Sequence, residues 1–127
     1  ARGYLTGKLT DPARQLEAAD IRHHMPRFNP DNYPLNLALL DRYKAIADEA
    51  GCTMAQLALA WLLAKAPHII PIPGTRHLDF ARENFAAIHV QLNGDQMARL
   101  DHLINRSTVV GPRYNEGTQQ EIDTEQF

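Results

Sequence analysis

The stretch Ile69-Ile70-Pro71-Ile72-Pro73-Gly74-Thr75-Arg76 decides the fold of this 127-residue chain. It is a short β-branched run that ends in a turn sequence, and a helical pattern follows it at once. Four apolar residues then recur at spacings of three, four and three, which is one face of a helix: Leu78, Ala81, Phe85 and Ile88. We therefore expect a short strand over His68–Ile72, a turn, and a helix.

Such a strand-to-helix turn suits an anion, because the first N–H groups of the helix have no partner within it. Gly74 lets a ligand approach the backbone closely. Thr75 can cap the helix or donate its hydroxyl, and the planar guanidinium of Arg76 matches a phosphate. The same spacing also fits an ordinary turn with normal capping and a solvated arginine, so the pattern alone leaves both interpretations open.

The segment Pro71–Arg76, followed by Arg82-Glu83-Asn84, resembles the cofactor signature of the aldo-keto reductases. In that family the signature spans the eighth strand of a barrel and the start of the eighth helix, and it holds the adenosine end of NADP(H). Gly51–Leu63 likewise resembles the family's seventh helix. The resemblance implies the α/β class, with this chain as the mostly helical C-terminal part of a (β/α)8 TIM barrel, from just after the seventh strand to the C-terminus.

The first 33 residues lack a sustained period and are punctuated by glycine and proline, which predicts a long loop with a short helical turn around Arg14–Ile21. Ala1–Lys8 resembles the family segment that folds over the pyrophosphate and nicotinamide ribose of the cofactor. The resemblance implies that Gly3 and Lys8 contact the cofactor, and that Arg27 in Pro26-Arg27-Phe28 does so from the same loop. Without the resemblance, Arg27 can equally be interpreted as an exposed arginine in a surface loop.

Residues 34–104 carry the helical patterns. Pro34 suits the first turn of a helix, whose apolar stripe comprises Leu35, Leu39, Tyr43, Ile46 and Ala50. Gly51 suits the left-handed position after a helix end. Thr53-Met54-Ala55-Gln56 is a capping box, and the helix over residues 54–64 is so apolar that we expect it to be mostly buried, with Trp61 in the core.

The last pattern begins at Asn93, which is placed to cap a further helix. Its expected buried face comprises Met97, Leu100, Leu103 and Ile104. In the family this helix closes the outer wall of the barrel after the eighth strand. From residue 105 to residue 127 the sequence is polar and aperiodic, which predicts a tail.

The composition is that of one ordinary domain, with 44% hydrophobic and 22% charged residues. The net charge of −2 provides no basic field for nucleic acid or an acidic membrane. The longest apolar run, Leu57–Ala64, is too short to span a bilayer, and we find no signal-peptide pattern. A single cysteine, Cys52, demands no oxidising compartment. We therefore expect a cytoplasmic protein.

A complete TIM barrel needs about 250 residues, so the chain is either a small domain of another kind or the tail end of a larger one. Aldo-keto reductases reduce carbonyl compounds with an Asp, a Tyr, a Lys and a His, and none of the family's motifs for these four occurs in this chain. We assign no catalytic residue and no metal ligand. The resemblance thus implies an NADP-dependent reductase of aldehydes or ketones whose catalytic residues and partner, the N-terminal part of the barrel, lie outside this chain.

The sequence departs from the family at Phe80, where many members carry Arg or Gln beside the adenine and its 2′-phosphate. Phenylalanine can pack on the adenine but cannot bind a phosphate. Recognition of the 2′-phosphate then depends on Arg76, helped by Thr75 and Arg82. Glu83 and Asn84 are expected at the adenine, as hydrogen-bonding groups. The full predicted cofactor set is Gly3, Lys8, Arg27, Pro73, Gly74, Thr75, Arg76, Phe80, Glu83 and Asn84.

Two alternatives belong to other classes of function. The first is a non-catalytic relative that keeps the scaffold to sense NADP. The second is a small helical binding module, because two helices joined by Gly-Cys-Thr superficially resemble a helix-turn-helix unit. The apolar second helix and the net negative charge argue against the latter. The presence of the Asp-Tyr-Lys-His set upstream would favour the enzyme over the sensor.

Overall fold

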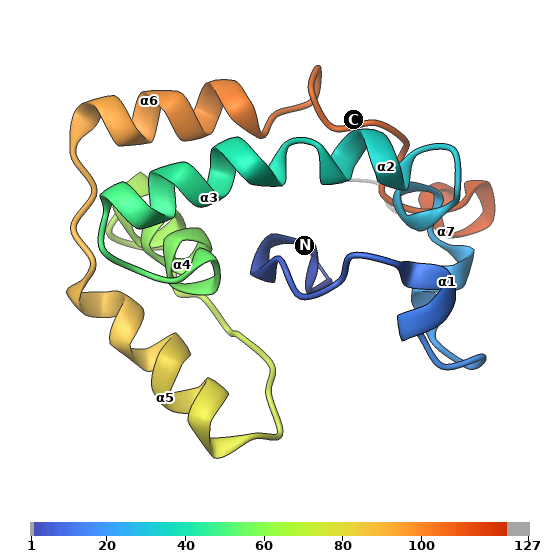
Figure 1. Ribbon diagram of the computed structural model, residues 1–127, viewed down its shortest axis with the longest axis horizontal. Coiled ribbons are helices and arrows are strands. Elements are labelled where there is room, and N and C mark those ends of the chain that lie inside the picture. Colours follow the sequence, from blue (N-terminus) through green and yellow to red (C-terminus); the bar gives the residue numbers. More distant parts are fainter. Residues whose placement is uncertain (1, 122–127) are drawn as a thin grey trace.

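A computed structural model of the chain describes residues 2–121, and their regular secondary structure is entirely helical (Figure 1). This confirms the expectation of a mostly helical chain. The elements are η1 (Tyr4–Thr6), α1 (Pro12–Gln15), η2 (Ile21–His24), η3 (Pro26–Phe28), α2 (Tyr33–Leu37), α3 (Leu40–Glu49), α4 (Met54–Lys65), α5 (Leu78–Ala86), η4 (Ala87–His89), α6 (Gly94–Leu103) and α7 (Glu116–Gln120).

The main core lies where α3, α4 and α6 meet. In Figure 1, α6 runs along α3, and α4 lies below α3 in this view. The side chains that fill this space are Leu39, Leu40, Tyr43, Ile46, Ala47, Leu57, Leu100 and Leu103. Leu57 is completely buried at the centre. The three helices thus form a small platform to which the other segments attach.

The predicted helix ends around this core are confirmed. Gly51 has a φ of 65°, the left-handed conformation expected after α3. In the capping box of α4, the Gln56 N–H donates to Thr53 Oγ1 at 3.2 Å and the Thr53 N–H donates to Gln56 Oε1 at 3.0 Å. Asn93 and Gln96 form a second capping box at the start of α6.

The single helix predicted from Pro34 is wrong in two respects. It is divided into α2 and α3 by a turn at Ala38 and Leu39, and Leu35 is 57% exposed instead of contributing to the buried stripe. The reason lies in the other side chains of α2. Tyr33 stacks on Phe28, and buried Asn36 bonds to the backbone of Val110, so Leu35 faces outward.

The predicted strand over His68–Ile72 is also wrong within the described residues. The segment between α4 and α5 is a loop, in which Ile70 is 81% exposed and Ile72 is 93% exposed. A strand exists only when its backbone pairs with a neighbour, and residues 2–121 contain no strand. Pro71 and Pro73 cannot donate hydrogen bonds, which weakens pairing further.

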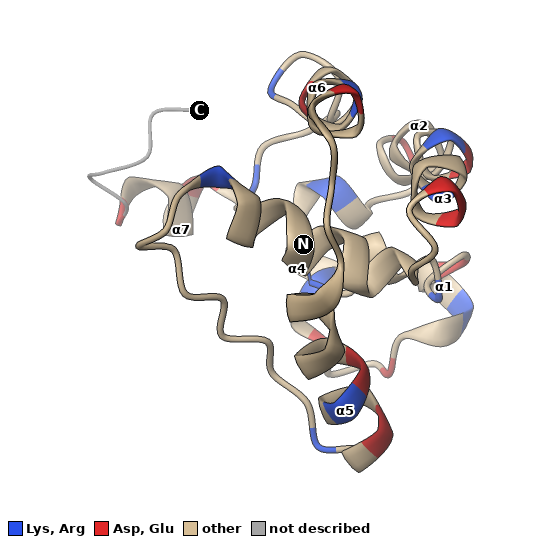
Figure 2. Ribbon diagram, turned by 90° about the vertical axis from the view of Figure 1, so that its left-hand side faces the viewer, with Lys and Arg blue, Asp and Glu red and all other residues tan. Residues whose placement is uncertain are grey.

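Two apolar surfaces are less covered than the sequence suggests. On α4, only Leu57 and Ala60 are fully buried, although the helix carries a single charge, at Lys65 (Figure 2). On α5 and η4, the predicted apolar face is exposed: Leu78 by 65%, Phe85 by 71% and Ile88 by 53%. The helical period was therefore predicted correctly, but the burial was not.

The N-terminal segment and the segment after α6 both differ from the predicted loop and tail. In the N-terminal segment, the helical turn predicted around Arg14–Ile21 is replaced by α1 and by η2, on either side of residues 16–20. The predicted tail is tied to α2 as far as Gly111, because the Asn36 side chain donates to Val110 O at 3.0 Å and accepts from Val110 N at 2.8 Å. Within residues 2–121, no helix is long and apolar enough to cross a membrane.

Candidate functional site

A groove of about 1140 Å³ lies between the N-terminal segment, α4 and the residues around the start of α5. Eight of the ten predicted cofactor residues line it: Gly3, Lys8, Pro73, Gly74, Thr75, Phe80, Glu83 and Asn84. They come from two segments that are far apart in the sequence, residues 3–8 and residues 73–84. Folding therefore brings the two predicted motifs into one cavity, although their contact with a cofactor stays a prediction.

The floor of the groove is apolar and comes from α4. Its residues are Met54, Ala55, Ala58, Leu59, Trp61 and Leu62. Trp61 is half-buried: it packs against the main core, as the sequence predicts, and it also lines the groove. Its indole N–H donates to Asp101 Oδ1 at 2.7 Å, and Lys65 pairs with the same carboxylate at 2.6 Å. These two bonds hold the ring in place at the wall of the cavity.

Lys8 and Phe80, which both line the groove, contact each other. The Lys8 ammonium lies 3.8 Å from the centroid of the Phe80 ring, within the range of a cation–π interaction. The imidazole of His77 also meets the Phe80 ring edge-on, with ring centroids 5.4 Å apart. Phe80 cannot bind a phosphate itself, but it places a positive charge from the N-terminal segment beside the first turn of α5.

The turn before α5 leaves room for an anion. Thr75 Oγ1 accepts the His77 N–H at 3.2 Å, one residue before the helix begins, and His77 makes no side-chain cap at the start of α5. A methyl group added at Gly74 would meet nothing within 4 Å. The backbone at Gly74 is therefore open, and the first N–H groups of α5 are not occupied by a capping side chain. The donor set fits the phosphate of a nucleotide.

Glu83 and Asn84 are half-buried on the side of α5 that faces the groove. The Gln56 side-chain amide donates to Glu83 O at 3.1 Å, so the capping box of α4 is tied directly to α5. This bond fixes the spacing between the apolar floor and the polar side of the groove.

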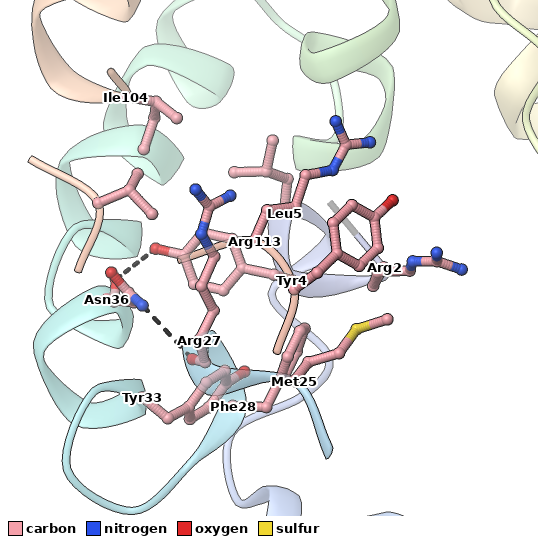
Figure 3. Close-up of a pocket in the computed structure, with 12 residues that line it drawn as sticks. Arg2, Tyr4, Leu5, Met25, Arg27, Phe28, Tyr33, Asn36, Ile104 and Arg113 are labelled. Atoms are coloured by element: carbon pink, nitrogen blue, oxygen red, sulfur yellow. Dashed lines mark hydrogen bonds between the residues drawn. The ribbon is translucent and has the colours of Figure 1, made fainter. Parts of the chain in front are cut away.

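Arg76 and Arg27 do not line this groove. Arg76 is exposed in the turn. Arg27 lines a second, smaller pocket of about 130 Å³, drawn in Figure 3, and its Nε donates to Gly111 O at 3.0 Å. Burial lowers the pKa of the Arg27 guanidinium, and the nearby charge of Arg113 lowers it further. The structure thus separates Arg27 from the other predicted cofactor residues.

Sequence reasoning missed most of this second pocket. It is lined by residues of the N-terminal segment, α2 and the segment after α6, among them Arg2, Tyr4, Tyr33, Asn36 and Arg113. The dashed lines in Figure 3 join Asn36 to Tyr4 and to the backbone of Arg27. No short sequence motif can predict such a pocket, because the residues that form its walls are far apart in the sequence. Among the described residues, no three His, Cys, Asp or Glu side chains gather as metal ligands.

Comparison with known proteins gives the family. The family model described as "Aldo/keto reductase family" matches residues 1–105. "Aldo-keto reductase yakc [NADP(+)]" of Schizosaccharomyces pombe is 36% identical over 121 residues, covering 95% of this chain and 35% of that protein. "Aldo-keto reductase str7" of Strobilurus tenacellus is 35% identical over 112 residues, covering 88% of this chain and 33% of that protein. The chain spans about a third of the length of these relatives. Because the family model matches most of its length, the chain belongs to the aldo/keto reductase family.

Proposed function

We propose that this chain is the NADP(H)-binding, C-terminal part of an aldo-keto reductase that reduces aldehydes or ketones by hydride transfer. The observation that carries the proposal is the groove in which Lys8 meets Phe80 beside the open turn at Gly74. A relative with 36% identity carries NADP(+) in its name, which supports the choice of cofactor.

The groove and the exposed Arg76 in the turn beside it would together hold the dinucleotide. Thr75, the first N–H groups of α5 and Arg76 would hold the 2′-phosphate, and Lys8 adds a positive charge nearby. Phe80 would pack on the adenine, with Glu83 and Asn84 as its hydrogen-bonding partners. The bound cofactor supplies the hydride, and the apolar floor from α4 keeps water away from its path.

The proton that completes the reduction must come from outside these 127 residues, because none of the family's catalytic motifs occurs in them. The same residues would equally serve a relative that senses NADP without turnover. A role of α4 in a DNA groove is not supported by its charge, since its one cation, Lys65, is paired with Asp101.

Replacing Arg76 tests the proposed cofactor site. Removing a charge-assisted hydrogen bond to a phosphate costs about 1.5–3 kcal/mol, which corresponds to roughly ten- to a hundredfold in affinity. Arg76→Ala should weaken NADPH binding by that factor and leave NADH binding nearly unchanged, because NADH has no 2′-phosphate. Trp61, the single tryptophan of the chain, lines the groove, so quenching of its fluorescence can report both titrations.

A suitable control is Arg42→Ala, which removes the same charge from the exposed side of α3, away from both cavities. Equal losses for NADPH and NADH would mean that Arg76 supports the fold or the pyrophosphate. Unchanged NADPH affinity would show that Arg76 is a solvated surface residue. If neither cofactor binds the unaltered protein, the proposed function itself is wrong.

A further inference from the structure

The smaller pocket has an unusual charge. Three arginines line it, Arg2, Arg27 and Arg113, and among the described residues no Asp or Glu does so. The chain as a whole has a net charge of −2. Positive charges therefore gather around this one cavity although the molecule as a whole is slightly acidic, and such a cluster attracts an anion.

Arg27 is the best-defined member of this cluster. Its Nε–H donates to Gly111 O at 3.0 Å, which orients the guanidinium and uses one of its five N–H donors. No ion pair of Arg27 with a carboxylate occurs within residues 2–121. The pKa of Arg27 is lowered by burial and by Arg113, so the site is under an electrostatic cost that a bound anion would relieve.

The walls of the pocket indicate what kind of molecule carries the anion. Tyr33 stacks on Phe28 with ring centroids 5.5 Å apart, and Tyr4 meets Tyr33 edge-on at 6.2 Å. The hydroxyls of Tyr4 and Tyr33 donate to the backbone carbonyls of Asn36 and Leu9. Their rings therefore serve as apolar wall, which favours a carboxylate on a hydrophobic body over a strongly hydrated inorganic phosphate.

The size and place of the pocket suit one end of a substrate. Its volume of about 130 Å³ is well below the roughly 300–1,000 Å³ of pockets that enclose a whole ligand. It shares Arg2, Leu5 and Ile104 with the larger groove, so the two cavities adjoin. A molecule held here by one end can extend its other end toward the groove.

We infer that this pocket binds the carboxylate of the carbonyl substrate, with Arg27 as its hydrogen-bonding partner and Arg113 adding positive charge nearby, and that the substrates of the reductase are aldehyde or keto acids with an apolar or aromatic body. The inference rests on the proposed function, because it assigns the substrate class of the same enzyme. It also gives Arg27 a different role from the cofactor contact that the sequence predicts.

Benzoate and benzamide form a matched pair for the test, since they share a shape and differ in charge. Isothermal titration should show that the protein binds benzoate at least about tenfold more tightly than benzamide, as expected for one charge-assisted hydrogen bond. Arg27→Met should remove this preference while changing benzamide binding less than about twofold. Arg113→Met should act in the same direction, and it keeps the test available if loss of the bond to Gly111 prevents Arg27→Met from folding.

The control is Arg42→Met, which should retain the full preference for benzoate. The inference is overturned if benzoate and benzamide bind equally, if inorganic phosphate displaces benzoate at an equal concentration, or if Arg113→Met and a folded Arg27→Met keep the preference.

A separate NADPH titration of every variant distinguishes the two proposals. Loss of NADPH affinity in Arg27→Met, with benzoate binding intact, would return Arg27 to the cofactor. If the unaltered protein binds NADPH but shows no preference for benzoate, the inference about the substrate is wrong and the proposed function is not affected.

Discussion

At the scale of single residues, Asn36 and Gly111 determine how the segment after α6 packs against α2. Asn36 is only 3% exposed and bonds in both directions to the backbone of Val110. Gly111 follows with a φ of 87°, and a Cβ at this position would lie 2.6 Å from Asn32 Nδ2. A buried amide and a left-handed glycine together hold the segment after α6 against α2, and with it one wall of the smaller pocket.

Gly111→Ala should therefore destabilise the protein by about 1–3 kcal/mol, because the left-handed conformation is unfavourable for alanine and the added methyl group collides with Asn32. Urea unfolding would measure the change. Gly94→Ala is the matched control, since a methyl group there meets nothing within 4 Å and the backbone is not left-handed. We expect it to stay within about 0.5 kcal/mol of the unaltered protein. Equal stabilities for the two variants would contradict this account of Gly111.

At the scale of elements, α4 connects the core to the groove. One side of it packs Leu57 into the main core, and its remaining apolar residues form the floor of the cavity. Its start is determined by the Thr53–Gln56 capping box, and Gln56 also donates to the backbone of α5. The capping box therefore contributes both to helix stability and to the geometry of the groove.

Thr53→Ala should reduce the free energy of unfolding by about 1 kcal/mol, as is typical when an N-cap side chain is lost. Its hydroxyl satisfies the Gln56 N–H at 3.2 Å, which alanine cannot do. Thermal unfolding followed by circular dichroism would detect the lower midpoint. Ser107→Ala, a substitution of an exposed hydroxyl outside any helix, should leave the midpoint almost unchanged. A Thr53→Ala variant as stable as the Ser107→Ala variant would rule out the capping contribution.

At the scale of the whole molecule, large apolar side chains lie exposed on the loop before α5 and on α5 itself. They include Ile70, Ile72, Leu78 and Phe85. Exposed apolar patches of this kind indicate a surface that another protein segment covers. We propose that the N-terminal part of the family's barrel covers them, and that the segment over residues 68–72 becomes a strand when a neighbouring strand supplies hydrogen bonds.

The 127-residue chain alone should not reduce any carbonyl compound, because it carries none of the family's motifs for the proton donor. Oxidation of NADPH in the presence of an aromatic aldehyde, followed by absorbance, should match the rate without protein. Turnover that disappears when Tyr4, Tyr33, Tyr43 or Tyr114 is changed to phenylalanine would reveal a catalytic group within this chain.

Local signals in the sequence were sufficient for the helix ends. The capping boxes at Thr53 and Asn93, and the left-handed Gly51, each depend on residues within one turn of the chain, so their neighbours in sequence are their partners in space. The two cofactor motifs were recognisable for a similar reason, since each is a short segment. Both motifs contribute to one groove because α4 and α5 hold them there: Gly3 and Lys8 from the first, and Pro73, Gly74, Thr75, Phe80, Glu83 and Asn84 from the second.

Only the tertiary structure decided what lies far apart in the sequence. The residues around Ile70 read as a strand, yet a strand needs a paired neighbour, and the described residues supply none. Leu35 fits an apolar stripe, yet Tyr33 and Asn36 bond elsewhere and turn it outward. Arg27 matches a cofactor loop, yet its bond to Gly111 places it in a different pocket. In each case the sequence determined which contacts a residue could make, and long-range packing determined which of them it makes.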